Sequence, residues 1–212
     1  MSKDRPAHAP AKRLAFPNPL LVVVSGPSGV GKSTVVAELA RRHPQVVPIV
    51  TATTRERRDG EMDKVHYHFL SGDEFQRLRD RGGLLEQAVV HDHWYGTPID
   101  QVRGILAAGR DAILTIDPQG ARSVRDLVPD ALLIFILPPS IEDLDQRLAR
   151  RGSEDGPARE LRRRNAEKEM ASAGDYDYEI VNQTGHPDEA VEQIWEIIQA
   201  EARRDPPRRV QV

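Results

Sequence analysis

Short apolar runs alternate with longer amphipathic stretches along most of this chain, from about residue 20 to residue 203. Four of the runs are almost continuously apolar, which is typical of strands in a parallel sheet that helices cover on both faces. The predicted strands are Leu20–Ser25, Ala112–Asp117, Leu132–Leu137 and Tyr178–Val181. This alternation predicts an α/β fold with a parallel sheet flanked by helices.

The stretches between these runs place apolar residues at the spacing of one helix face. Near the end of the chain, apolar residues recur at helical spacing, at Val191, Ile194, Ile197 and Ile198. The predicted helices are Lys32–Arg42, Asp73–Arg81, Ile99–Ala108, Ile141–Arg150, Ala158–Ala171 and Asp188–Arg203.

The alternation is interrupted between residues 51 and 98. Short alternating runs, such as Val65, Tyr67 and Phe69, and turn glycines replace the longer periods there. We therefore expect a small mixed α+β insert at 51–98, within a core domain made of 20–50 and 99–203. Residues 1–19, with several prolines, predict a flexible leader, and the basic residues 204–212 predict a disordered tail.

Composition excludes several classes of protein. With 39% hydrophobic and 30% charged residues the chain is an ordinary globular protein, and with no cysteine it has neither disulfides nor Cys-based metal sites. The longest apolar run, Leu20–Val24, is far shorter than the roughly 20 residues of a membrane span. The net charge of −3 argues against a general nucleic-acid binder. We expect a cytoplasmic protein, a monomer or a homodimer, with no membrane or nucleic-acid partner.

A phosphate-binding loop follows the first predicted strand. The segment fits the pattern G-x-x-x-x-G-K-[ST] with the residues Gly26, Pro27, Ser28, Gly29, Val30, Gly31, Lys32, Ser33 and Thr34. Glycines let the backbone N–H groups point inward, and the N-terminus of the next helix adds partial positive charge. Lys32 would reach the β- and γ-phosphates of ATP, and the Ser33 hydroxyl would ligate Mg²⁺.

Asp117 ends the second long apolar strand. A carboxylate in this place would lie on the Mg²⁺ side of a phosphate-binding loop. It could instead cap the N-terminus of a helix that starts near Gln119. Both interpretations remain open at this point.

The loop indicates the phosphate donor but not the acceptor. A series of short motifs indicates the acceptor. In order they are Thr53-Thr54-Arg55, Gly60-Glu61, Tyr67-His68-Phe69, Leu85-Glu86, Tyr95-Gly96-Thr97, Asp117-Pro118-Gln119-Gly120-Ala121, Pro138-Pro139-Ser140, Arg147-Leu148, Arg151-Gly152 and Val181-Asn182. In this order the motifs resemble those of guanylate kinases over residues 20 to 203. The resemblance implies a P-loop NTPase-type fold with a GMP-binding insert and an Arg-rich lid at about 147–165.

The resemblance also implies an ATP- and Mg²⁺-dependent phosphorylation of GMP and a role for particular residues. The GMP phosphate would be held by Arg55, Arg58, Tyr67 and Tyr95, and the GMP base would meet Glu86, Thr51 and Thr97, with Asp117 beside it. The catalytic cations would be Lys32, Arg55 and the lid arginines Arg147, Arg151 and Arg162, which close over the ATP phosphates. Asn182 would lie near the adenine.

Three positions depart from the family's pattern, and two other functions stay open. Arg57 replaces a usual Pro, Lys64 a usual Gly, and Thr115 a usual acidic residue close to the Mg²⁺ site. A related kinase with another acceptor, such as a different nucleotide or a sugar phosphate, would keep the loop and the lid. A guanylate-kinase-like binding module without catalysis would usually have a degraded loop, whereas Gly31, Lys32 and Ser33 are intact.

Two His-x-His pairs, His66/His68 and His91/His93, have no counterpart in this pattern. Four imidazoles could bind zinc. With Tyr67 pointing inward, His66 and His68 should point outward, which disfavours a shared metal site.

Overall fold

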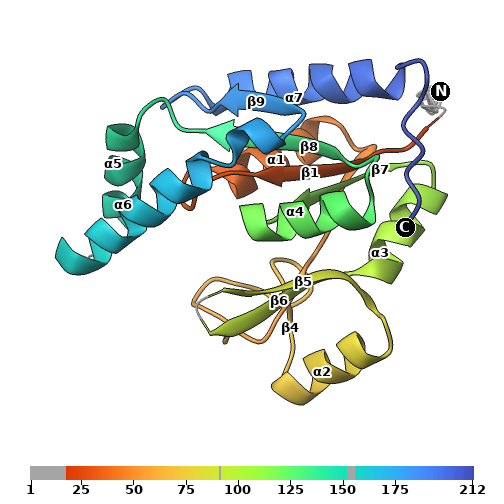
Figure 1. Ribbon diagram of the computed structural model, residues 1–212, viewed down its shortest axis with the longest axis horizontal. Helices are drawn as coiled ribbons and strands as arrows, with labels where there is room; N and C mark the ends of the chain where they lie inside the picture. The colour runs from red at the N-terminus through yellow and green to blue at the C-terminus, as the bar shows by residue number, and fades with distance from the viewer. Residues whose placement is uncertain (1–17, 91, 152–155) are drawn as a thin grey trace, which may run out of the picture.

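The computed structural model describes residues 18–90, 92–151 and 156–212, and it describes no side chain between residues 150 and 162. A parallel sheet of five strands forms the centre (Figure 1). In spatial order its strands are β2 (Val46–Pro48), β7 (Asp111–Thr115), β1 (Leu21–Ser25), β8 (Leu132–Leu137) and β9 (Tyr178–Val181). All their pairings are parallel, which confirms the predicted fold class.

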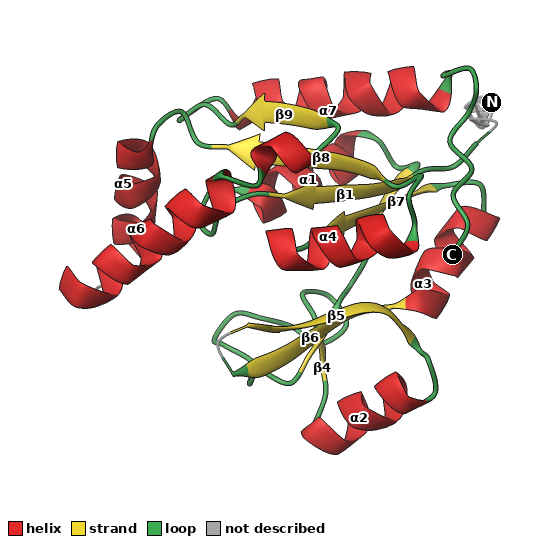
Figure 2. Ribbon diagram, viewed as in Figure 1, coloured by secondary structure: helices red, strands yellow, loops and turns green. Residues whose placement is uncertain are grey.

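Helices cover both faces of this sheet (Figure 2). Side chains alternate along β1, so Val22 and Val24 face one buried cluster while Leu21 and Val23 face the other. The first cluster is completed by α1 (Lys32–Arg42) and α7 (Pro187–Ala202), the second by α3 (Ile99–Ala107) and α4 (Pro118–Leu127). With a helix layer on either side, the central strands are apolar throughout.

The predicted strands and helices agree with the structure to within a few residues at each end. Outside the insert, whose strands were predicted only as part of a mixed α+β region, one strand and one α-helix were missed. β2 was not predicted, because three residues that end in Pro48 form too short an apolar run. A helix at the place of α4 was predicted only in the alternative interpretation of Asp117, as an N-cap. None of the described helices is long and apolar enough to cross a bilayer.

A second, smaller sheet lies below the core in Figure 1, within the predicted insert. Its four strands are β4 (His68–Phe69), β3 (Ala52–Thr53), β6 (His93–Pro98) and β5 (Leu84–Val90), in that spatial order. Helix α2 (Gly72–Asp80) packs Phe75 against Trp94, with ring centroids 6.0 Å apart. Leu85 of β5 belongs to the same buried cluster as Val124 of α4, so this sheet docks on the core through α4.

Two helices, α5 (Ile141–Arg151) and α6 (Gly156–Met170), lie beyond the carboxyl ends of β8 and β9 (Figure 1). A short 3₁₀ turn, η1 (Ala173–Asp175), leads from α6 to β9. The phosphate-binding loop follows β1 at the same edge of the sheet, and Asp117 follows β7 there. Ligands of open α/β sheets bind outside this carboxyl edge.

The two ends of the chain differ from each other. Of the predicted leader 1–19, residues 1–17 lie outside the described residues. The predicted disordered tail, by contrast, is packed on the core: Arg208 is only 8% exposed, and its Nε donates to Glu201 Oε2 at 2.6 Å. Val210 and Val212 pack against the cluster under α3 and α4. The prediction of a disordered tail was therefore wrong. The sequence of a polar, proline-rich segment does not show which distant residues it pairs with.

Candidate active site

The phosphate-binding loop has the backbone that its glycines predicted. Gly26 and Gly31 have φ values of +142° and +104°, which side chains other than hydrogen rarely allow. A Cβ on Gly26 would also collide with the carbonyl oxygen of Ile136, and one on Gly31 would lie 2.6 Å from Asn182 Nδ2. These two positions require glycine for both conformation and space.

The loop and the start of α1 form an anion site. Lys32 Nζ donates to the carbonyl oxygens of Gly26 at 2.6 Å and Pro27 at 3.1 Å, so the ammonium group lies against the loop. Ser33 and Thr34 are exposed in the first turn of α1, which contains no acidic residue. The Ser28 N–H of the loop donates to Glu169 Oε2 at 3.2 Å. A lysine and a helix N-terminus without acidic residues are features that fit the triphosphate of ATP.

Two predicted ATP-side residues brace the loop. The Val30 carbonyl oxygen accepts from Asn182 Nδ2 at 2.8 Å and from Arg147 Nη1 at 2.9 Å. Arg147 Nη2 also donates to the Asn182 carbonyl at 2.8 Å. In this conformation Arg147 and Asn182 therefore fix the loop's shape. Arg151 lies at the end of α5 and Arg162 on α6, but their side chains are outside the described residues.

A cavity of about 240 Å³ lies between the loop and the insert. It is lined by Lys32, Ser33, Thr51, Tyr67, Glu86, Ala88, Val90, Tyr95, Gly96, Thr115, Ile116, Asp117 and Gly120. The structure thus brings Lys32 and Ser33 of the predicted ATP site together with Thr51, Tyr67, Glu86, Tyr95 and Asp117 of the predicted GMP site. The alternation along β5 explains part of this lining, because Glu86, Ala88 and Val90 share one face of the strand.

Glu86 is a buried carboxyl group in this cavity with a raised pKa. It is only 6% exposed, and Thr97 Oγ1, itself fully buried, donates to its Oε1 at 2.6 Å. Burial raises the pKa of Glu86 to about 7; the hydrogen bond from Thr97 opposes this shift, and the charge of Asp117 adds to it. Thr97, predicted to contact the base, holds the Glu86 carboxylate in this structure.

The two tyrosines and Arg55 form the other end of the insert's polar surface. The rings of Tyr67 and Tyr95 are 5.9 Å apart, and the Arg55 guanidinium lies over the Tyr67 ring at 5.5 Å from its centroid. Glu61 accepts from Arg55 Nη2 at 2.7 and 3.0 Å. Burial raises the pKa of Tyr67, so its hydroxyl stays protonated and able to donate.

No role for Glu61 was predicted from the sequence. Its Oε2 also accepts from the backbone N–H of Arg58 at 2.8 Å, whereas the rest of Arg58 is exposed. Glu61 therefore orients Arg55 and shapes the turn that carries Arg58. The available signal in the sequence was an acid that closely follows three arginines, Arg55, Arg57 and Arg58.

Asp117 performs the capping role that was its alternative interpretation. Its Oδ1 accepts from the Gly120 N–H at 2.8 Å, at the N-terminus of α4. The residue still lines the cavity with Ser33 and Thr115. A hydroxyl and a carboxylate at one side of a phosphate site fit Mg²⁺, which usually keeps several waters and takes one or two carboxylates.

The histidine pairs do not make a second metal site among the residues described. His66 Nδ1 accepts from the Met62 N–H at 2.9 Å, and His68 lies on β4. Over 18–90, 92–151 and 156–212, no three His, Cys, Asp or Glu side chains are grouped to hold a metal ion. His91 falls outside these residues.

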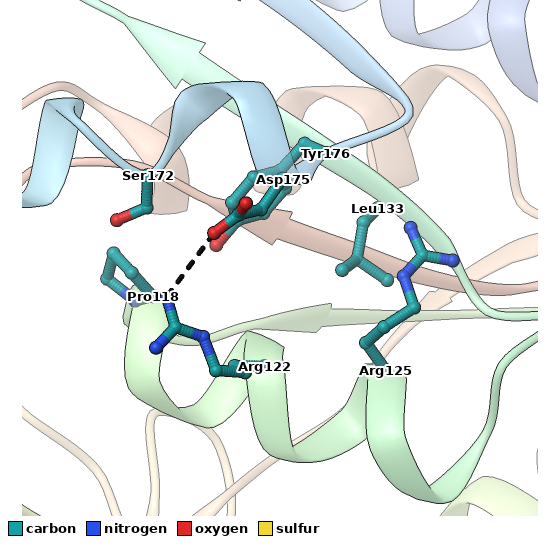
Figure 3. Close-up of a pocket in the computed structure, with 7 residues that line it drawn as sticks. All are labelled: Pro118, Arg122, Arg125, Leu133, Ser172, Asp175 and Tyr176. Carbon is teal, nitrogen blue, oxygen red and sulfur yellow. Dashed lines mark hydrogen bonds and ion pairs between the residues drawn. The ribbon is translucent and has the colours of Figure 1, made fainter.

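A larger cavity, of about 430 Å³, lies along another face of α4 (Figure 3). Its two arginines are already engaged by carboxylates: Arg122 Nη2 lies 3.3 Å from Asp175 Oδ2, and Arg125 Nη2 lies 2.9 Å from Asp177 Oδ2. The cavity has no part of the phosphate-binding loop in its lining. We therefore assign the active site to the smaller cavity.

Comparison with known proteins agrees with this geometry. A family model described as "Guanylate kinase" matches residues 18–201. A guanylate kinase of Desulfitobacterium hafniense (strain Y51) is 45% identical over 163 residues, which are 77% of this chain and 82% of that protein. One of Clostridium perfringens (strain SM101 / Type A) is 42% identical over 185 residues, or 87% of this chain and 85% of that protein. The crystal structure of guanylate kinase from Anaplasma phagocytophilum superposes with a TM-score of 0.73 at 31% identity and covers 88% of each chain. The chain belongs to the guanylate kinase family.

Proposed function

We propose that this protein transfers the γ-phosphate of ATP to GMP, giving ADP and GDP. The observation that carries the proposal is the single cavity that joins Lys32 and Ser33 of the phosphate-binding loop to Glu86 and Tyr95 of the insert. A phosphate donor and an acceptor bound in this cavity would face each other. Membership of the guanylate kinase family supports the same pair of substrates.

Glu86 supplies the preference for guanine. Guanine presents N1–H and N2–H₂ as adjacent donors, and an ionised carboxylate accepts from both, whereas adenine lacks this pair. The site is buried, so an unmatched donor or acceptor would cost more there than in water. A glutamate held by Thr97 is therefore a discriminating acceptor for GMP.

The phosphate of GMP would be held at the other end of the insert. Arg55 offers a planar guanidinium that is oriented by Glu61, and Tyr67 and Tyr95 offer hydroxyl donors. The guanidinium neutralises one of the two negative charges of the phosphate, and the hydroxyls donate hydrogen bonds to its oxygens. Arg58 is exposed on the neighbouring turn and could join them on binding.

The chain's part in the transfer is positioning and charge neutralisation. Lys32 would stabilise the moving phosphoryl group, and the lid arginines Arg147, Arg151 and Arg162 would add charge and exclude water as the lid closes. Ser33 and Asp117 would hold Mg²⁺, which when bound neutralises phosphate charge. No general base is needed for this mechanism. A cytoplasmic location and a monomeric or dimeric state remain predictions.

The acceptor is tested by ADP release with GMP, AMP, CMP, UMP and several sugar phosphates. We expect GMP to support the highest kcat/KM by a factor of about a hundred or more. A Lys32→Ala variant should lose transfer but keep its affinity for GMP, because Lys32 belongs to the donor site. High turnover with another acceptor would favour the related-kinase alternative, and no turnover with any would favour the binding module.

A further inference from the structure

Both oxygens of the Glu86 carboxylate are confined, each by a different neighbour. Oε1 accepts from Thr97 Oγ1 at 2.6 Å. On the Oε2 side lies Gly120, in the first turn of α4. A methyl group placed on Gly120 by ideal geometry would lie 3.2 Å from Oε2 and 3.3 Å from Ile116 Cδ1. The carboxylate thus fits between a hydroxyl donor and the backbone of a helix.

Gly120 is not a glycine for conformational reasons. Unlike Gly26 and Gly31, it is not among the glycines with a positive φ, and it lies inside a regular helix. Alanine is the better helix former at such a position. The missing side chain therefore weakens the helix and provides only space.

The neighbouring side chains cannot easily move to make room for a Cβ on Gly120. Contacts of 3.2 to 3.4 Å to an added Cβ would require Glu86 or Ile116 to move by a few tenths of an ångström. Ile116 is β-branched and stiff at χ1. Glu86 is held from the other side by the fully buried Thr97, so displacing Oε2 also disturbs the hydrogen bond at Oε1.

We propose that Gly120 is a specificity-determining positioning residue, whose missing Cβ lets Glu86 present its carboxylate to the GMP base. The inference rests on the proposed role of Glu86 in GMP binding. Gly120 would not touch the reacting atoms; its missing Cβ would affect GMP binding through Glu86, while its N–H continues to donate to Asp117. An added methyl group would therefore weaken GMP binding while the ATP site, the fold and the helix are preserved.

The test compares Gly120→Ala with a matched control, Gly104→Ala. Gly104 is an exposed glycine of α3, and a Cβ there would meet nothing within 4 Å. Gly120→Ala should raise the KM for GMP about tenfold, since small misplacements of a binding group have large effects. Its KM for ATP and its kcat should stay within about twofold of wild type. Gly104→Ala should match wild type in all three, and neither variant should melt below it.

A double-mutant cycle with Glu86→Gln identifies the route of the effect. If Gly120 acts through Glu86, Gly120→Ala should raise the KM for GMP far less in the Glu86→Gln background than alone. An equal increase in both backgrounds would contradict the proposal, as would an unchanged KM in Gly120→Ala. If Gly120→Ala lowers the melting temperature, Glu86→Asp is added to that variant, because it shortens the side chain by one methylene and withdraws the carboxylate from the added methyl group. The double variant should then regain the melting temperature. A melting temperature that stays low would also contradict the proposal.

The same measurements separate this inference from the proposed function. Wild-type protein that turns over GMP, combined with a silent Gly120→Ala variant, overturns the role of Gly120 and leaves the GMP kinase intact. Wild-type protein that binds ATP but gives no product with GMP overturns both.

Discussion

At the scale of single residues, the proposed contact between Glu86 and guanine depends on the charge of the carboxyl group. The ionised carboxylate accepts from N1–H and N2–H₂, whereas the protonated form brings a donor toward those donors. Because its pKa is raised to about 7, a substantial fraction is protonated at neutral pH. We predict that the KM for GMP falls as the pH rises through 7 and is about tenfold higher near pH 6 than on the alkaline plateau. Steady-state kinetics across this range measure it.

Glu86→Gln is the control for this pH dependence. The variant should lose kcat/KM for GMP by about 10² to 10⁴ and keep its KM for ATP, because the amide can accept at only one atom. What pH dependence remains in it belongs to the GMP phosphate, which titrates near pH 6. A variant with the wild-type profile would reject Glu86 as the titrating group.

Lys64 shows how a departure from the family's pattern has a physical meaning. It has a φ of +62°, a left-handed conformation, and its N–H donates to the Tyr67 carbonyl at 2.7 Å. Glycine adopts this conformation without the Cβ penalty but loses more entropy on folding. Lys64→Gly should raise the free energy of unfolding by about 0.5–1 kcal/mol in urea denaturation. Lys64→Ala keeps the strained conformation and should give no gain; an equal gain would place the effect in the lysine side chain.

Much of the site could be predicted at this scale, but its supports could not. The spacing of Gly26, Gly31 and Lys32 predicts the loop, since its chemistry is local in sequence. The contacts that orient Glu86 join residues on different strands and helices. Thr97 and Gly120 flank Glu86 only because β5, β6 and α4 pack together. No spacing of residues along the sequence indicates that these elements are neighbours.

At the scale of elements, the strands buried on both faces were the most predictable. A continuous apolar run such as Leu132–Leu137 has few alternatives to a covered strand. β2 and the tail escaped prediction for the opposite reason, because their place depends on partners elsewhere. The tail is anchored by Arg208, which contacts Glu201 of α7, Asp177 before β9 and the carbonyl oxygen of Ala131.

This anchoring gives a prediction for stability. Removing Arg208 leaves the carboxylate of Glu201 buried with only the Tyr178 hydroxyl, which donates at 2.7 Å, beside the more exposed Arg204. Arg208→Ala should lower the free energy of unfolding by about 2–4 kcal/mol. The neighbouring, exposed Arg209 is the control, and its change to Ala should cost less than about 0.5 kcal/mol. Equal losses in both variants would show that the tail is not anchored by its buried arginine.

At the scale of the whole molecule, the candidate active site lies between the core domain and the insert. The core contributes the phosphate-binding loop and Asp117, and the insert contributes Glu86 and the tyrosines. Leu85 of the insert and Val124 of the core belong to one buried cluster, so the two units pack against each other. Two substrates that bind on different units can then be brought into line when the units and the lid close.

The measurement that tests this account most directly follows the phosphoryl group itself. Wild-type protein is given ATP labelled at the γ-phosphate, Mg²⁺ and GMP, and the products are separated. We predict that the label appears in the β-phosphate of GDP, with one ADP formed for each GDP and little free phosphate. Label released as inorganic phosphate, or transferred equally well to AMP, would contradict the account.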